Sequence, residues 1–292
     1  MQRNKSSSSN LFDKSILITG CSSGIGKYVA LQLHEKGYRV FATARAAEDV
    51  ESLKAQGLTA YQLDVDSSES IINAVNWVLE QTGGRLYALF NNGAYGQPGA
   101  VEDLSRSVLR QQFETNVFGW HELTNLIIPV MRKQGYGRII HNSSVLGLVA
   151  MKYRGAYNAS KFALEGLADT LRQELAGSGV TLSLIEPGPI TSQFRENAFT
   201  KFKENITVAG SAHQSTYELV EKRLASSDES SAPFTLGPEA VMKKVECILM
   251  SKRPKPRYYV TFPTYLFGYL KRLLPACWLD RLLLAISERE NR

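Results

Sequence analysis

Residues 14–26 of the chain read KSILITGCSSGIG, and this stretch decides the fold. Residues 14–19 form an apolar run typical of a short buried strand, and 25–36 have the apolar spacing of a helix. The turn between them carries Gly20, Gly24 and Gly26, so its backbone can approach a phosphate closely. The helix N-terminus adds free N–H groups and a partial positive charge. We therefore expect this stretch to bind the phosphates of a nucleotide.

Strand and helix patterns alternate along the rest of the chain. Further strands are predicted at 38–44, 58–63, 86–90, 138–142, 180–185 and 257–261, and helices at 67–82, 104–134, 157–175 and from 237 onward. Such alternation produces βαβ units with right-handed crossovers and a parallel sheet. We predict an α/β fold of the Rossmann type, in which a doubly wound parallel sheet of about seven strands is flanked by helices on both faces.

The chain divides into three predicted segments. Residues 1–12 are polar and are expected to form a flexible tail. Residues 13–261 form the Rossmann-fold domain. Within it, about 190–236 is polar and irregular apart from a short helix at 217–225, and a long structureless stretch of this kind is usually a functional lid. Residues 262–292 form an amphipathic, basic helical extension.

Composition excludes several classes of protein. The chain has 292 residues, of which 43% are hydrophobic and 21% charged, as in an ordinary soluble globule. Its three cysteines lie far apart, and its four histidines show no ligand spacing, so neither a disulfide scaffold nor a metal site is expected. The N-terminus lacks the apolar core of a secretory signal. We expect a cytoplasmic protein.

The net charge of +6 is concentrated near the C-terminus. Residues 243–292 hold 11 of the 34 Lys and Arg residues and 4 of the 28 Asp and Glu residues. Such a balance suggests nucleic acid, anionic lipid or an anionic cofactor, but no DNA-reading motif is present and no nucleic-acid partner is expected. Lys271, Arg272 and Arg281 alternate with leucines, so the extension could touch a membrane peripherally. We favour the alternative that it covers the domain or a neighbouring subunit.

The end of the second strand indicates which nucleotide binds. A dinucleotide fold that prefers NAD(H) carries Asp or Glu there, against the ribose 2′-hydroxyl. Residues 42–45 read ATAR, without an acid, and Arg45 could pair with a 2′-phosphate through its planar guanidinium. The alternative is an arginine that only faces solvent. NADP(H) is therefore favoured over NAD(H). Asp64, after the third strand, could accept from the adenine amino group or could cap its own loop.

The sequence YNASK at 157–161 indicates proton chemistry. Tyr157 and Lys161 lie four residues apart, on one face of a helix. Free tyrosine has a pKa of ~10, and a nearby ammonium lowers it, which would make Tyr157 a general acid or base. Ser144 follows the strand at 138–142 and could hold a carbonyl oxygen. Asn116, a poor helix former inside a predicted helix, could hold a water that links Lys161 to solvent.

Taken together, these motifs resemble those of the short-chain dehydrogenase/reductase family over residues 14 to about 192. The matching segments are TGCSSGIG (19–26) and YNASK (157–161). ATAR (42–45), SKFALEGL (160–167) and SLIEPGPI (183–190) add a closer similarity to bacterial NADP-dependent aldehyde reductases and to the 17β-hydroxysteroid and retinol dehydrogenases.

The resemblance implies a set of site residues. Its catalytic tetrad would be Asn116, Ser144, Tyr157 and Lys161. Its cofactor-binding residues would be Gly20, Ser22, Ser23, Gly24, Ile25, Gly26, Arg45, Asp64, Val65, Asn92, Tyr157, Lys161, Pro187, Gly188, Ile190 and Ser192. One departure is visible, because residues 91–94 read NNGA where the family has NNAG. If the family glycine needs a positive φ, Ala94 would be strained.

The implied reaction is hydride transfer between NADP(H) and a carbonyl or alcohol, and the favoured substrates are apolar aldehydes or ketones. A steroid or retinoid dehydrogenase with the same mechanism is the alternative. A non-catalytic NADP-sensing protein is a further alternative, against which the intact tetrad argues. The family also implies a homodimer or homotetramer built through the helices around Asn116 and Tyr157. Candidate pocket walls, which could equally fill the core or lid, are Tyr95, Leu146, Val149, Met151, Phe194, Phe199 and Phe202.

Overall fold

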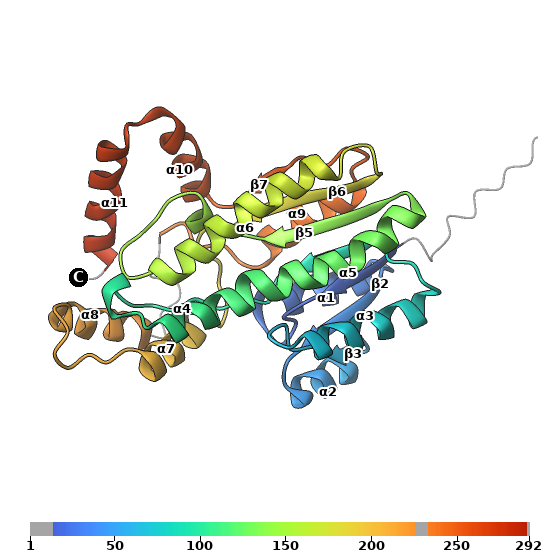
Figure 1. Cartoon of the computed structure of the whole chain (residues 1–292), viewed down its shortest axis with the longest axis horizontal. Coiled ribbons are helices and arrows are strands. Elements are labelled where there is room, and N and C mark those ends of the chain that lie inside the picture. The colour runs from blue at the N-terminus through green and yellow to red at the C-terminus, as the bar shows by residue number, and fades with distance from the viewer. Residues whose placement is uncertain (1–13, 226–232, 291–292) are drawn as a thin grey trace, which may run out of the picture.

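The computed structural model describes residues 14–225 and 233–290 (Figure 1), so the tail predicted over 1–12 lies outside the described residues. All seven strands in the described part are parallel, in the order β3-β2-β1-β4-β5-β6-β7. Their bounds are β1 Ser15–Ile18, β2 Arg39–Ala44, β3 Thr59–Gln62, β4 Ala88–Asn91, β5 Gly137–Asn142, β6 Val180–Glu186 and β7 Arg257–Tyr259. The predicted doubly wound sheet is confirmed, and its order reverses between β1 and β4, where open α/β sheets bind ligands.

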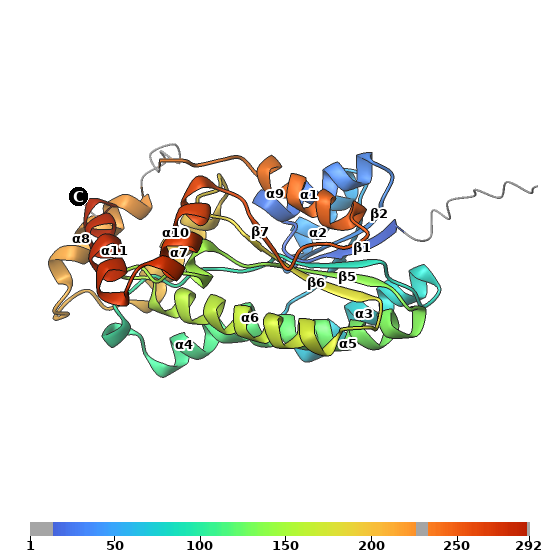
Figure 2. The same cartoon turned by 90° about the horizontal axis from the view of Figure 1, so that it is seen from above.

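Helices cover both faces of this sheet (Figure 2). One face carries α1 (Gly24–Glu35), α2 (Ala47–Ala55) and α9 (Glu239–Met250). The other carries α3 (Ser68–Thr82), α4 (Arg106–Phe113), α5 (Gly119–Gln134) and α6 (Gly155–Glu174). The helix α2 was not among the predicted elements. The helix predicted at 67–82 is α3, which begins after the capping hydroxyl of Ser67 and ends before Gly83, which has a left-handed backbone.

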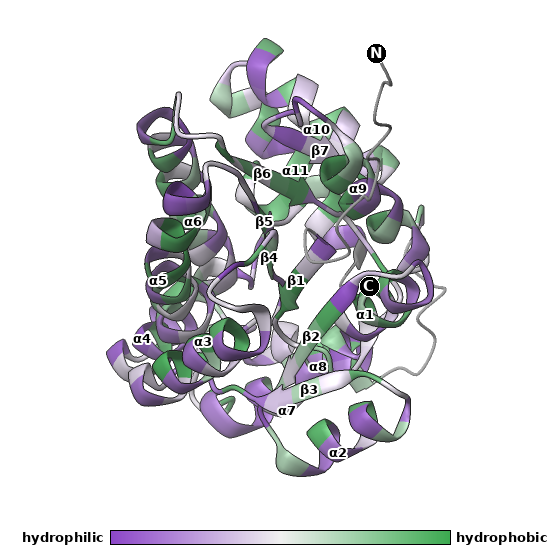
Figure 3. Ribbon diagram, turned by 90° about the vertical axis from the view of Figure 1, so that its right-hand side faces the viewer, coloured by the Kyte–Doolittle hydropathy of each residue, from purple (hydrophilic) through white to green (hydrophobic). Residues whose placement is uncertain are grey.

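The alternation of side chains along β1 explains why the sheet is covered twice. Ile16 and Ile18 point into the cluster under α1 and α9, while Leu17 points into the cluster under α3, α5 and α6. Apolar residues therefore run continuously through the strand, which is typical of a parallel sheet buried on both faces. Figure 3 shows the same layering, with hydrophobic strands in the middle and hydrophilic residues on the outer sides of the helices.

The single helix predicted over 104–134 is divided. It consists of α4, a π-helical turn at Glu114–Phe118 and α5. A π turn adds a residue to the helical turn and is common at functional sites. Asn116 lies within this turn, so the poor helix former stands where the regular α-helix is interrupted.

The stretch predicted to be irregular, 190–236, contains two helices. The short helix expected at 217–225 is α8 (Gln214–Ala225), and α7 (Phe194–Asn205) was missed. Helix α7 is mostly polar, and only Ala198 and Phe202 are buried along it. These helices form a small core together with Ala100, and in it the rings of Phe202 and Tyr217 lie 5.5 Å apart. Residues 226–232 lie outside the described part.

The predicted C-terminal helix is also two helices, α10 (Phe262–Leu273) and α11 (Ala276–Glu290). Pro275 separates them, because proline disfavours the helical conformation in the residue before it. Both helices lie with α7 and α8 at the end of the sheet formed by the carboxyl ends of the strands (Figures 1 and 2). Their inner faces, through Phe267 and Leu283, pack on Val149 and Met151. Within residues 14–225 and 233–290, no helix combines the length and apolarity needed to span a bilayer.

Candidate active site

The glycine turn after β1 packs so closely against its surroundings that side chains there would collide with the protein itself. Gly20 has φ +68°, and a Cβ there would lie 2.4 Å from the Cα of Gly93. A Cβ on Gly26 would lie 2.1 Å from the carbonyl oxygen of Gly20. Asn92 fixes the turn, because its Nδ2 donates to the carbonyl oxygens of Thr19 and Gly20, both at 3.2 Å. The turn is therefore held in one conformation, with its backbone at the N-terminus of α1, where a phosphate could bind.

The start of α1 leaves polar groups for a ligand. Ser23 precedes the helix in an extended conformation, and its hydroxyl does not cap it. Ser22 is exposed, and Ile25 packs against the apolar layer under α1. The predicted phosphate-binding residues thus stand together at one helix N-terminus, where the dipole favours an anion.

The exchanged order of Gly93 and Ala94 causes no strain. In the described chain, only Tyr153 and Phe234 among non-glycine residues have a positive φ. The expectation that Ala94 would be strained is therefore wrong. A Cβ on Gly93 would lie 3.2 Å from Gly20, so glycine at 93 suits the close approach of the two turns.

Residues predicted for the adenosine end lie along the same edge of the sheet. Arg45 follows β2 directly and is exposed, and its carbonyl oxygen accepts from Gln62 Nε2 at 2.9 Å. Asp64 follows β3, and its carboxylate accepts from the backbone N–H of Asp66, as the loop-capping alternative predicted. The carbonyl of Val65 lies against Gly119 at the start of α5.

Asn116 connects three parts of the site. The residue is fully buried, and its Nδ2 donates to the carbonyl oxygen of Tyr95 (3.0 Å) and to Ser160 Oγ (3.1 Å). Its Oδ1 accepts from the backbone N–H of Tyr95 at 3.3 Å. These bonds tie the π turn to α6 and to the loop after β4. One lone pair of Oδ1 is left for a further donor, such as the predicted water.

Ser144 and Tyr157 meet at the carboxyl edge of the sheet. Ser144 lies two residues beyond β5, and its Oγ accepts from the N–H of Leu146 at 3.1 Å. A hydrogen bond between Ser144 and the Tyr157 phenol lowers the pKa of Tyr157, but burial outweighs it and raises that pKa to about 12. The predicted lowering of this pKa is therefore wrong for the structure as it stands.

Lys161 is only 1% exposed, and its burial explains why the pKa of Tyr157 is not lowered as predicted. Its Nζ donates to the carbonyl oxygen of Asn142 at 2.7 Å and lies 5.6 Å from the centre of the Tyr157 ring. Burial lowers the pKa of Lys161 to about 7, so the amine is only partly charged at neutral pH. The spacing correctly predicts that the amine lies beside the phenol. It does not predict the burial that shifts the pKa values of both groups.

Trp120 is a site residue that the sequence analysis missed. Its indole ring lies 4.5 Å below the Lys161 amine, and its Nε1 donates to the carbonyl oxygen of Gly93 at 2.8 Å. A cation over an aromatic face is stabilised by the ring quadrupole. The signal was available, because Trp120 lies four residues after Asn116 on the same helical run.

Residues 187–192 arch from the end of β6 toward the glycine turn. The carbonyl oxygen of Pro187 accepts from the N–H of Val145, and the N–H of Gly188 donates to Thr261 Oγ1. Ile190 pairs with Leu236, and Ser192 contacts Gly24, where a Cβ would lie 3.0 Å from the Cβ of Ser192. The segment therefore connects the glycine turn with the loop that carries Ser144.

The predicted apolar walls separate into two groups. Phe194 packs edge-on against Tyr157, with ring centres 5.3 Å apart, and also contacts Gly96. Phe202 is buried between α7 and α8, and Val149 and Met151 pack on the C-terminal helices. Phe194 can therefore face a substrate, whereas Phe202, Val149 and Met151 pack in the interior, as the alternative predicted.

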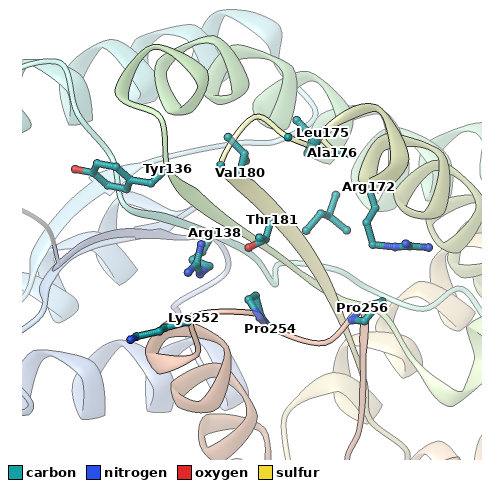
Figure 4. A pocket seen from close by; sticks show the side chains of 13 residues that line it. Tyr136, Arg138, Arg172, Leu175, Ala176, Val180, Thr181, Lys252, Pro254 and Pro256 are labelled. Atoms are coloured by element: carbon teal, nitrogen blue, oxygen red, sulfur yellow. The ribbon is translucent and has the colours of Figure 1, made fainter.

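A hollow of about 450 Å³ lies at the opposite, amino edge of the sheet (Figure 4). It is bordered by the start of β6, the end of α6 and the segment before β7, and Arg138, Arg172 and Lys252 line it. None of the predicted site residues belongs to it. The predicted residues gather at the carboxyl edge.

Comparison with known proteins finds relatives over most of this chain. The family model for short chain dehydrogenases matches residues 14–203. The Escherichia coli (strain K12) protein named uncharacterized oxidoreductase YbbO is 44% identical over 273 residues, which are 94% of this chain and 95% of that protein. Human retinol dehydrogenase 8 is 33% identical over 257 residues, which are 84% of this chain and 80% of that protein.

Two solved structures with a bound nicotinamide nucleotide share the fold. A short chain dehydrogenase/reductase from Burkholderia phymatum in complex with NAD has a TM-score of 0.73 at 25% identity, covering 89% of this chain and 92% of that one. An actinorhodin polyketide ketoreductase with NADPH has a TM-score of 0.66 at 26% identity, covering 81% of this chain and 90% of that one. Similar proteins therefore hold either form of the nucleotide.

Proposed function

The chain belongs to the short-chain dehydrogenase/reductase family of nicotinamide-dependent oxidoreductases, and on that premise we propose that it reduces apolar aldehydes or ketones with NADPH. The observation that carries the proposal is the contact between the Ser144 hydroxyl and the Tyr157 phenol, with the buried Lys161 amine beside the phenol ring. Ser144 and Tyr157 offer two hydroxyl groups to one carbonyl oxygen, at the edge where this fold binds ligands.

The residues along this edge fit the cofactor. Glycine at 20 and 26 lets the turn close tightly on the loop that carries Gly93, which leaves its backbone N–H groups for a phosphate. The glycine turn and Ser23 would hold the pyrophosphate, Arg45 the 2′-phosphate, and 187–192 the nicotinamide. The preference for NADP(H) rests on Arg45 and on the lack of an acid in 42–45.

The bound cofactor would supply the hydride to the carbonyl carbon. Ser144 would orient the carbonyl, and Tyr157 would pass its phenolic proton to the carbonyl oxygen. Because the pKa of Tyr157 is raised to about 12, the phenol carries its proton at neutral pH. The charge on Lys161 would favour the phenolate that remains after the transfer. Asn116 would keep the α6 face in place through Ser160.

An apolar substrate is supported by the surroundings of the phenol. Phe194 packs on Tyr157, and the buried Leu146 follows Ser144 by two residues. Apolar walls with a few polar groups are typical of sites for small hydrophobic ligands. A retinoid or steroid is the second candidate, and the identity with human retinol dehydrogenase 8 favours testing it.

We expect NADPH oxidation to be fastest with octanal or a similar apolar aldehyde in a panel that also contains retinal, a 17-ketosteroid and a hydrophilic sugar. The measurement is the steady-state loss of NADPH absorbance, repeated with NADH. Best turnover on the sugar would contradict the apolar-substrate proposal.

The substitution Tyr157→Phe tests the proposed proton donor. It keeps the ring that packs on Phe194 and removes only the hydroxyl, so about 10²-fold or more of the rate should be lost, the usual range for a general acid. NADPH affinity should stay nearly unchanged. A variant that retains its rate would show that another group donates the proton.

The substitution Arg45→Ala should weaken NADPH binding about tenfold or more while leaving NADH binding unchanged, because a charge-assisted bond to the 2′-phosphate is lost. Titration of each nucleotide by protein fluorescence measures both affinities. Arg39→Ala, at the other end of the same strand, is the control. Equal losses for the two nucleotides would assign Arg45 no role in discrimination.

We also propose that two copies associate through α5 and α6, as the family resemblance implies. Phe118, just before α5, is 50% exposed, and Leu167, on α6, is 45% exposed. Light scattering should give two or four times the chain mass, and Leu167→Glu should lower it, whereas Leu219→Glu on α8 should not. A monomeric wild-type protein would contradict the proposal.

For the C-terminal helices we propose an intramolecular role in a cytoplasmic protein, rather than a contact with anionic lipid. Their inner faces already pack on Val149 and Met151, beside the loop that carries Ser144. The protein should therefore stay in the supernatant when it is sedimented with anionic vesicles at low salt. Binding that depends on Lys271 and Arg272 would favour the peripheral membrane alternative.

A further inference from the structure

A cluster of charged residues lies buried behind the proposed catalytic lysine. It joins α6, β6 and β7, and its centre is Glu165, which follows Lys161 by four residues on the same helix face. Glu165 is 6% exposed. Its side chain also fits against Gly147 in the loop after Ser144, where a Cβ would lie 3.0 Å from the Glu165 Cγ. The Glu165 side chain therefore runs from the helix that carries Lys161 to the loop that follows Ser144.

The Lys161 amine has few charged neighbours. From β5 it meets His141, which burial keeps neutral by lowering its pKa to about 3. From α5 it meets the indole of Trp120, and from α6 the phenol of Tyr157. Glu165 is the carboxylate that raises the pKa of Lys161, against the effect of burial. An ammonium with so little exposure is costly without such a counter-charge.

Arg257 holds Glu165 from the other side. Its Nη2 donates to Glu165 Oε2 at 2.9 Å and to Asp169 Oδ2 at 2.8 Å, and its Nε lies 3.1 Å from Glu186 Oε1. Lys271 of α10 also acts on Glu165, and Arg172 binds Asp169 at 3.1 Å.

Three carboxyl groups thus share one guanidinium, and they cannot all be charged at low cost. Glu186 is completely buried, and burial with the nearby Glu165 charge raises its pKa to about 9, so it carries a proton. Asp169 is more open, and its cationic partners lower its pKa. Burial raises the pKa of Glu165 as well, whereas a hydrogen bond with Ser143 and the Arg257 guanidinium lower it. With Glu186 protonated, the Arg257 fork is left to Glu165 and Asp169, and this contact is what keeps Glu165 charged.

We propose that Glu165 is a positioning residue that keeps the Lys161 amine protonated, and that Arg257 holds Glu165 for this task. The inference deepens the proposed function, since it concerns the same site, but its main test needs no substrate. Glu165 touches neither substrate nor cofactor in this role. Glu165 acts through Lys161. Arg257 holds the Glu165 carboxylate in place, and the protonated Glu186 does not compete for Arg257.

The test is the titration of Lys161 in the whole protein. Lysines are labelled with ¹³C at the ε carbon, and the Lys161 resonance is identified by its loss in Lys161→Met. In Glu165→Gln the pKa of Lys161 should fall by about one unit or more, the usual effect of losing a nearby opposite charge. Asp169→Asn is the matched control, because it removes another carboxylate from Arg257 one helical turn farther from Lys161. This control should leave the Lys161 titration nearly unchanged.

A Lys161 pKa in Glu165→Gln that moves no more than in Asp169→Asn would overturn the proposal. If Glu165→Gln does not fold, as judged by circular dichroism, Glu165→Asp decides instead. That variant moves the carboxylate back by one methylene, so the pKa of Lys161 should fall by a smaller amount, and no change in a folded protein would again overturn the proposal.

Kinetics provide a second readout. In Glu165→Gln the high-pH limb of carbonyl reduction should move to lower pH, because Lys161 loses its proton earlier. A purely structural role would lower the rate equally at every pH. Should the wild-type protein reduce none of the carbonyls, the proposed function fails, and the lysine titration still decides the role of Glu165.

Discussion

The Lys161 amine lies in a place where a charge is costly, and the rest of the site is arranged around that cost. The carbonyl oxygen of Asn142 accepts its hydrogen bond, the Trp120 ring lies below it, and Glu165 stands one helical turn away. Each partner comes from a different element, namely β5, α5 and α6. The sheet and the two helices must therefore pack correctly before the lysine can be charged, so the chemistry of the site depends on the whole layer under the sheet rather than on one loop.

The glycine turn and the lysine site are linked through the loop after β4. Gly93 approaches Gly20 on one side, and its carbonyl oxygen accepts from the Trp120 indole on the other. Asn92 adds a second link, since it binds the turn and also accepts from Asn142 Nδ2 at 2.9 Å. A Cβ at 93 would lie only 3.2 Å from the Cα and N of Gly20. Glycine at 93 therefore suits the close approach of the two turns.

Much of the fold could be predicted from local patterns. Strand β1 was recognisable because a strand buried on both faces is apolar throughout, and the ends of such strands locate Ser144 and Arg45 at one edge. The π turn at Asn116 could not be predicted, since it accompanies bonds to Tyr95 and Ser160, which are distant in the sequence. Helix α7 was hidden because so few of its residues are buried. The acidification of Tyr157 was expected from the spacing of Tyr157 and Lys161, but spacing carries no information on burial.

Burial shifts the pKa values of the two neighbouring groups in opposite directions, and this bears on the proposed proton transfer. It raises the pKa of Tyr157 to about 12 and lowers that of Lys161 to about 7, so near neutral pH the phenol is protonated and the amine is half charged. Carbonyl reduction starts from the protonated phenol, so its proton donor is ready. Alcohol oxidation must first create the phenolate, and each pH unit below the pKa of Tyr157 reduces the phenolate fraction tenfold. The positive charge on Lys161 stabilises that phenolate. That phenolate is left by the proton transfer in reduction and is the starting form in oxidation, so the charge on Lys161, and the counter-charge that we propose for Glu165, act on the same group in both directions.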